Sequence, residues 1–270
     1  MPEKRDLRGG TTTDKLPTTG PDADPADSTT EGQPNASRVP DDSSAGPTVK
    51  AKVAMVVAVV FAGLIASQVV HSLKEILPRP AGLEGMPPYP PEVLAALARV
   101  ELGDMAIAFG VAGAIIGGVL GGGLVLFSPQ GATATRGAGV GFIAGATLGA
   151  VGGFANVLVS RSIETSEFDD LFKGMFIHLA YWVCMGIAFG MTVGVTVRRA
   201  SIARAIGTGI GAGVVASLLY PLVSMLLFPA ARLELLVPFD LGSRLLWFGL
   251  SSGLLAWAAV RSLPGTGHAG

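Results

Sequence analysis

Few polar side chains in this sequence lie where they could do chemistry, and four of them lie close together along the chain. Asn156 lies near the end of one apolar stretch, and His178 lies early in the next. Asp169 and Asp170 lie in the connection between the two stretches. Carboxylate and imidazole groups bind metal ions, and together with an amide they can also hold a polar substrate. We take these four residues as the candidate polar site.

The spacing of these residues matches no zinc or calcium pattern, because the sequence has no closely spaced pair of histidines and no pair of cysteines. His178 lies beside Tyr181 and Trp182, so the alternative interpretation is an aromatic belt at the membrane interface. An enzyme would need Asp169, Asp170 and His178 to converge. The sequence has no His-Glu-x-x-His, Gly-x-Ser-x-Gly or Walker A motif. We therefore predict no catalytic residue, no cofactor and no metal.

Glycine residues repeat at four-residue spacing inside the apolar stretches. Residues four apart share one face of a helix, and a face without side chains lets another backbone approach closely. The pattern predicts tight helix–helix packing, within the chain, with a second copy or with another membrane protein, and it specifies no activity. The predicted packing residues are Gly113, Gly117, Gly121, Gly141, Gly145, Gly149, Gly153, Gly186, Gly190, Gly194, Gly207 and Gly211.

The composition is that of a protein embedded in a lipid bilayer. Half of the 270 residues are hydrophobic and 14% are charged, whereas soluble domains carry about 25% charged residues. The mean hydropathy is +0.55. A net charge of −1 gives no basic footprint for nucleic acid. We predict an all-α membrane protein that binds no nucleic acid.

Six apolar runs of about 20 residues are long enough to cross the bilayer as helices. They predict one transmembrane domain, a glycine-rich bundle over residues 51–262, with a short tail at 263–270. Residues 1–50 are rich in Pro, Thr, Ser and Asp, which predicts a disordered tail. The predicted spans are 53–72, 105–127, 138–159, 174–197, 205–228 and 243–260.

Basic residues in the connections predict the orientation of the spans. Lysine and arginine accumulate on the cytoplasmic side of membrane proteins, so both termini are expected in the cytoplasm. Arginine outnumbers lysine and glycine is abundant, which is typical of GC-rich bacterial genomes and predicts the bacterial inner (plasma) membrane. The basic residues expected at the cytoplasmic end are Lys50, Lys52, Arg136, Arg198, Arg199, Arg204 and Arg261.

The connection after the first span predicts a short helix over 91–102 at the opposite membrane face. Gly103 is expected to end this helix and Asp104 to cap the second span. None of the six predicted spans has an acidic or basic residue in its middle, which argues against a transporter that uses buried carboxylates.

Two spans share a tetrapeptide, at 107–110 and at 187–190, and each is followed by an arginine and a second glycine-rich span. A duplication of parallel helix pairs, as in some transporters, is one interpretation, and shared composition is the other. Pro221 predicts a kink in the fifth span.

Packing motifs without chemical motifs favour a non-enzymatic membrane protein with a structural or accessory role. The alternative hypothesis is a small-solute channel or carrier built on the duplicated pairs. It predicts a cavity lined by Asn156, Thr192 and Ser217.

Overall fold

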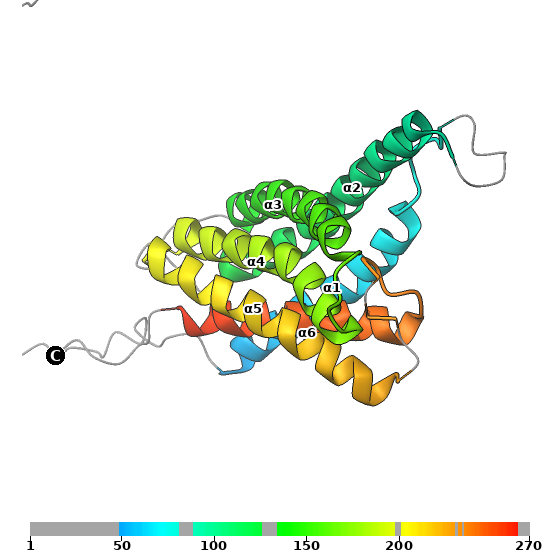
Figure 1. Cartoon of the computed structure of the whole chain (residues 1–270). Helices are drawn as coiled ribbons and strands as arrows, with labels where there is room; N and C mark the ends of the chain where they lie inside the picture. Colours follow the sequence, from blue (N-terminus) through cyan, green and yellow to red (C-terminus); the bar gives the residue numbers. More distant parts are fainter. Residues whose placement is uncertain are drawn as a thin grey trace, which may run out of the picture. The chain divides into compact units, whose positions relative to one another are not determined.

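The computed structural model describes residues 49–80, 89–125, 134–197, 201–229, 232–233 and 235–263, and all regular structure in these ranges is helical (Figure 1). Six helices there are long and apolar enough to cross a membrane. They are α1 Val49–Leu73, α2 Pro91–Leu124, α3 Ala134–Ile163, α4 Asp170–Thr196, α5 Ile202–Leu227 and α6 Leu241–Arg261.

This architecture confirms the prediction of an all-α membrane protein with six spans. Of the two predicted tails, residues 1–48 and 264–270 lie outside the described residues. The first helix already begins at Val49, so the two residues before the predicted boundary at 51 are helical.

The helices form a ring of neighbours. Each helix contacts the next one along the chain, and α6 contacts α1. Contacts between α2 and α4 and between α4 and α6 cross the ring. The apolar windows of α2, α4 and α6 are 61%, 61% and 56% buried, against 39%, 33% and 33% for α1, α3 and α5. The even-numbered helices are therefore the inner ones, and each has an outer neighbour on both sides.

The closest packing joins α2 to α3 through glycine. A Cβ atom added to Gly113 would overlap the backbone carbonyl of Gly145, and one added to Gly117 would overlap that of Gly141. The overlap also occurs in the reverse direction, so neither helix tolerates a side chain along this line. Such close approach brings backbone atoms into contact and holds helices together in lipid, where hydrophobic burial cannot. The same line includes Gly121, Gly137, Gly149 and Gly153.

A second glycine contact joins α4 to α5. A Cβ on Gly186 would overlap the carbonyl of Gly209, and one on Gly190 would overlap the backbone at Ile206. Gly194 lies against the first turn of α5. The inner helix α4 is thus fitted to its outer neighbour in the same way that α2 is fitted to α3.

Two of the predicted packing glycines face away from this contact. A Cβ on Gly207 or Gly211 would have nothing within 4 Å. Residues two apart lie on nearly opposite sides of a helix, so Gly209 and Gly213 meet α4 while Gly207 and Gly211 are exposed. Beyond them, α5 continues through Pro221 to Leu227.

A third contact closes the ring between α1 and α6. A Cβ on Gly63 would overlap the side chain of Ser252, and a Cβ on Gly249 would lie 3.2 Å from Leu64. Three antiparallel pairs, α2–α3, α4–α5 and α6–α1, therefore each contain glycine at the contact, on one helix or on both.

The prediction of a separate helix over 91–102 is wrong, because α2 runs without a break from Pro91 to Leu124. Gly103 stays helical beneath the side chain of Leu77 and does not end the helix. The lack of a side chain at Gly103 therefore lets Leu77 pack closely against α2. The helix has 34 residues and is about 51 Å long, so it exceeds the roughly 30 Å of hydrocarbon. Its first turns extend beyond the bilayer core.

Candidate functional site

His178 lies in the interior of the bundle. Its side chain is fully buried, and its ring centroid lies 5.1 Å from that of Tyr220 on α5 and 4.7 Å from that of Trp247 on α6. No described residue makes a well-formed hydrogen bond to either imidazole nitrogen, although the backbone of Leu233 lies close enough to interact. The histidine predicted for the polar site is thus enclosed by aromatic rings.

These rings belong to a larger group, here called the aromatic core. The ring centroids of Phe109 and Tyr181 are 4.4 Å apart, and those of Trp182 and Phe248 are 5.7 Å apart in an edge-to-face arrangement. Such separations are typical of directly packed aromatic pairs. The rings themselves therefore fill the space between the inner helices. The aromatic core consists of Phe109, His178, Tyr181, Trp182, Tyr220, Trp247 and Phe248.

Asn156 is a buried residue of α3. It follows by one turn Gly152, whose added Cβ would contact Tyr181 and Cys184. The side chain is fully buried, and neither amide atom has a hydrogen-bond partner among the described residues. Most buried polar atoms in proteins are paired, and this amide is one of several buried polar groups of the bundle without a protein partner, as are His178 and Tyr181.

Asp169 and Asp170 lie on the surface at the start of α4. The carboxylate of Asp169 accepts a hydrogen bond of 2.9 Å from the backbone N–H of Leu171, so it caps the helix. Both acids line an open cleft of about 390 Å³ together with Arg232 and Phe228.

The structure therefore divides the four residues of the predicted polar site. Asp169 and Asp170 face the surface cleft, whereas Asn156 and His178 are buried in the bundle and do not line it. Within the described ranges, no group of three or more His, Cys, Asp or Glu side chains could hold a metal ion. The enzyme hypothesis required both acids to reach the histidine, and the cleft that the acids line does not include it.

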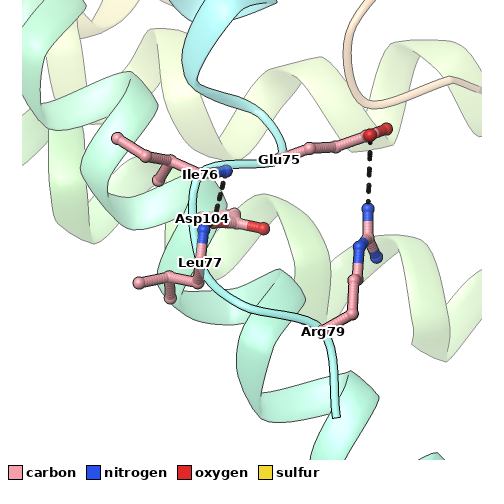
Figure 2. A network of polar contacts seen from close by, with 5 residues as sticks. All are labelled: Glu75, Ile76, Leu77, Arg79 and Asp104. Carbon is pink, nitrogen blue, oxygen red and sulfur yellow. Dashed lines mark hydrogen bonds and ion pairs between the residues drawn. The ribbon is translucent and has the colours of Figure 1, made fainter. Parts of the chain in front are cut away.

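Asp104 is a buried charge whose role the sequence did not reveal. It lies inside α2 with only 1% of its surface exposed, so the prediction that it caps the start of this helix is wrong. Its Oδ1 atom accepts hydrogen bonds from the backbone N–H groups of Ile76 and Leu77, at 3.1 Å and 2.7 Å (Figure 2). Both donors lie in the chain segment that leaves α1. The carboxylate therefore fastens this segment to the side of α2.

A surface ion pair lies beside the Asp104 contact and differs from it in being exposed to solvent. Glu75 and Arg79 are 3.6 Å apart, and both side chains are largely exposed (Figure 2). Exposed pairs of this kind contribute little to stability, because water solvates both groups well. The buried Asp104 makes the firmer connection.

Arg244 is a second buried charge, in the first turn of α6. Its guanidinium lies 2.6 Å from His71 Nδ1 and donates a hydrogen bond of 3.0 Å to the carbonyl of Phe239. Because arginine has no acceptor, the Nδ1 atom must accept, which requires a neutral imidazole that carries its proton on Nε2. Arg244 therefore joins the end of α1 to the start of α6.

A hydroxyl network lies at the same end of the bundle. The Tyr220 hydroxyl is 2.9 Å from Ser243 Oγ, which is 3.1 Å from Ser224 Oγ. The backbone N–H of Ser243 donates to the Asp240 carboxylate at 2.6 Å. These contacts fasten α5 to α6 close to the aromatic core.

The remaining polar residues of the channel hypothesis are engaged by their own helices. Thr192 donates a hydrogen bond of 2.7 Å to the carbonyl of Ala188, and Ser217 donates one of 2.8 Å to that of Val214.

Comparison of the chain with protein-family models, with curated proteins and with solved structures finds no match.

Proposed function

We propose that this multi-pass membrane protein is non-enzymatic and acts as a structural or accessory component that binds a partner helix. The observation that carries this proposal is the exposed small-residue row on α5, formed by Ala203, Gly207 and Gly211. The glycine rows inside the bundle are each covered by a neighbouring helix. This row has the same four-residue spacing, and none of the six described helices covers it.

The partner can be a second copy of the chain or another membrane protein. Small residues at this spacing let two helix backbones approach closely, which is the usual basis of helix association in lipid. The buried polar groups support a structural role, since Asp104, Arg244 and Ser243 each connect one helix to another segment.

Crosslinking in mild detergent or in membranes tests the proposal. The wild-type chain should yield a covalent oligomer or a crosslinked partner, and Gly211→Leu should abolish it by blocking close approach. Gly139→Leu is the matched control, because Gly139 also has nothing within 4 Å but lies on α3. Only monomers without a partner, together with solute flux in liposomes, would contradict the proposal.

The second candidate function is a small-solute channel or carrier. It is favoured by the unpaired amide of Asn156 and the unpaired imidazole of His178, both buried in the bundle, because such groups could pair with a polar solute. The similarity of the α2–α3 and α4–α5 pairs also fits a duplicated transporter core. Flux of small polar solutes into liposomes, present in wild type and lost in Asn156→Leu, would support this function over the structural one.

We further propose that both termini face the cytoplasm of a bacterial cell. Lys50 and Lys52 lie at the start of α1, Arg204 lies at the start of α5 and Arg261 lies at the end of α6. Since the helices alternate in direction, these cations share one end of the bundle, as the positive-inside rule expects. Alkaline phosphatase fused after residue 80 should be active, and fused after residue 263 it should be inactive. The reverse pattern would overturn the proposed orientation.

A further inference from the structure

A groove of about 610 Å³ opens between the first turns of α1 and the last turns of α6. The two helices touch at Gly253, whose added Cβ would lie 3.2 Å from Val60, and the groove begins beyond this point. Its volume lies within the range of about 300–1,000 Å³ that is typical of ligand sites. The groove is therefore large enough for part of a lipid molecule.

The groove has an apolar floor and apolar walls. Val56 and Val260 form its floor and pack into the bundle core. Val53, Val57 and Trp257 form its walls, and they are 55%, 45% and 49% exposed. A large aromatic residue at the end of a transmembrane helix is typical of the membrane interface. These surfaces fit a hydrocarbon chain.

Two cations lie at the mouth of the groove. Lys52 and Arg261 are the only charged side chains among the described residues that line it. The Arg261 guanidinium stacks on the Trp257 ring, 4.2 Å from its centroid, which fixes the direction in which it projects. Both groups bind phosphate oxygens well, and the guanidinium can do so with two parallel hydrogen bonds.

The groove lies where phospholipid headgroups lie. The 21 residues of α6 give a length of about 31 Å, which matches the hydrocarbon thickness, so its last turn reaches the headgroup region. Basic pockets between transmembrane helices at this depth are known to bind anionic headgroups.

We propose that this groove binds one anionic phospholipid, with Lys52 and Arg261 on the phosphate and with Trp257 and the valines on the upper acyl chain. The charge of the mouth selects anionic over zwitterionic lipid, and the groove selects lipid over a free anion. This site is separate from the exposed face of α5 and does not depend on the partner proposed there.

Native mass spectrometry of the full chain tests the site, using phosphatidylglycerol and phosphatidylcholine with identical acyl chains as probes. The wild type should bind phosphatidylglycerol preferentially. Each cation near an anionic surface contributes roughly fivefold in affinity, so the double variant Lys52→Gln/Arg261→Gln should lose about 25-fold. An unchanged preference in this double variant would overturn the proposal.

Two further variants separate the groove from general surface charge. Lys50→Gln removes an equal charge from the same turn of α1, but Lys50 is exposed and does not line the groove, so lipid preference should persist. Val57→Trp leaves the charge unchanged and fills the groove, so phosphatidylglycerol binding should fall severalfold. An equal loss in Lys50→Gln, or full binding in Val57→Trp, would overturn the proposal.

A competition arm distinguishes lipid from free phosphate. Inorganic phosphate in millimolar excess should not displace the bound phosphatidylglycerol, because it cannot occupy the apolar walls. Displacement by phosphate alone would identify a simple anion site and contradict the proposal. Circular dichroism of each variant checks that the helices are retained.

Discussion

Single buried polar side chains in this bundle bind free backbone groups and connect helices, a role that loops and helix caps have in many other proteins. Asp104 and Arg244 are both buried, and each bonds to backbone groups that no helix satisfies. A buried charge is costly unless it is hydrogen-bonded, and these bonds offset part of that cost. At this scale the charged residues are structural, and they connect helices near the bundle end.

Asp104→Ala should destabilise the protein strongly. It leaves the backbone N–H groups of Ile76 and Leu77 without their acceptor, and the expected loss in free energy of unfolding is about 2 kcal/mol. Asp104→Asn should cost less, because both hydrogen bonds go to a single oxygen that the amide retains. Titration with a denaturing detergent measures the loss.

The neighbouring Glu75→Gln is the control for this experiment. Its ion pair with Arg79 is exposed, so the expected change is below about 0.5 kcal/mol. Equal losses in free energy of unfolding for Asp104→Ala and Glu75→Gln would show that the Asp104 hydrogen bonds stabilise the protein no more than a surface ion pair does.

Two glycines of α5 give a matched pair of substitutions. Gly209→Ala puts a methyl group into the carbonyl of Gly186, and overpacking of this kind costs about 1–3 kcal/mol. Gly211→Ala adds the same methyl group where nothing lies within 4 Å, so stability should stay within about 0.5 kcal/mol. A comparison of the two melting temperatures in one detergent tests this, and a larger loss for Gly211→Ala would contradict the structure.

The same two positions show what the sequence can and cannot predict about a site. The four-residue glycine spacing predicts that a helix face is small, but it does not say which of two rows, Gly207 with Gly211 or Gly209 with Gly213, meets a neighbour. That choice depends on the rotation of α5 against α4, which is a tertiary property. The division of Asn156 and His178 from Asp169 and Asp170 is likewise invisible in the sequence, which gives only their spacing along the chain.

At the scale of elements, α2 is the helix that departs most from expectation. The six spans follow from hydropathy, since about 20 apolar residues are required to cross the bilayer and each run meets that length. The continuation of α2 toward Pro91 does not follow from hydropathy, because its first turns mix polar and apolar residues. Outside the membrane core, the contact of Glu101 with Arg161 joins this extension to α3.

Cysteine labelling tests the length of α2 outside the bilayer. In a Cys184→Ala background, Ala95→Cys should react with a membrane-impermeant maleimide, because Ala95 is exposed on the extension. Val111→Cys should be protected, since Val111 is also partly exposed but lies within the hydrocarbon region. Equal protection at both positions would show that the extension lies in the membrane.

At the scale of the whole bundle, one packing solution recurs three times. Each inner helix carries a buried phenylalanine followed by a glycine, and each of these glycines contacts the outer helix of its own pair. This recurrence extends the predicted similarity of two helix pairs to a third pair, in which the outer helix comes first in the chain. The dipeptides are Phe109-Gly110 in α2, Phe189-Gly190 in α4 and Phe248-Gly249 in α6.

A disulfide crosslink tests the third pair. With Cys184→Ala, the double variant Gly63→Cys/Ser252→Cys should oxidise readily in membranes, because a Cβ on Gly63 would lie 3.0 Å from the Ser252 Cβ. Disulfides need about 3.5–4.5 Å between these atoms, so only a small relaxation is required. Phe61→Cys/Ser252→Cys is the control, since Phe61 is 61% exposed. Crosslinking in the control alone would refute the pairing.

The contact between α1 and α6 has a consequence for biogenesis. The hairpins α2–α3 and α4–α5 consist of helices that leave the ribosome one after the other, so each can associate as soon as it enters the lipid. The first helix also contacts α2, but its Gly63 face, which packs on α6, stays open until the sixth helix has been inserted. The ring therefore cannot close before α6 has been synthesised, and a nascent chain stalled before α6 would present an unfinished surface that quality-control proteases can recognise.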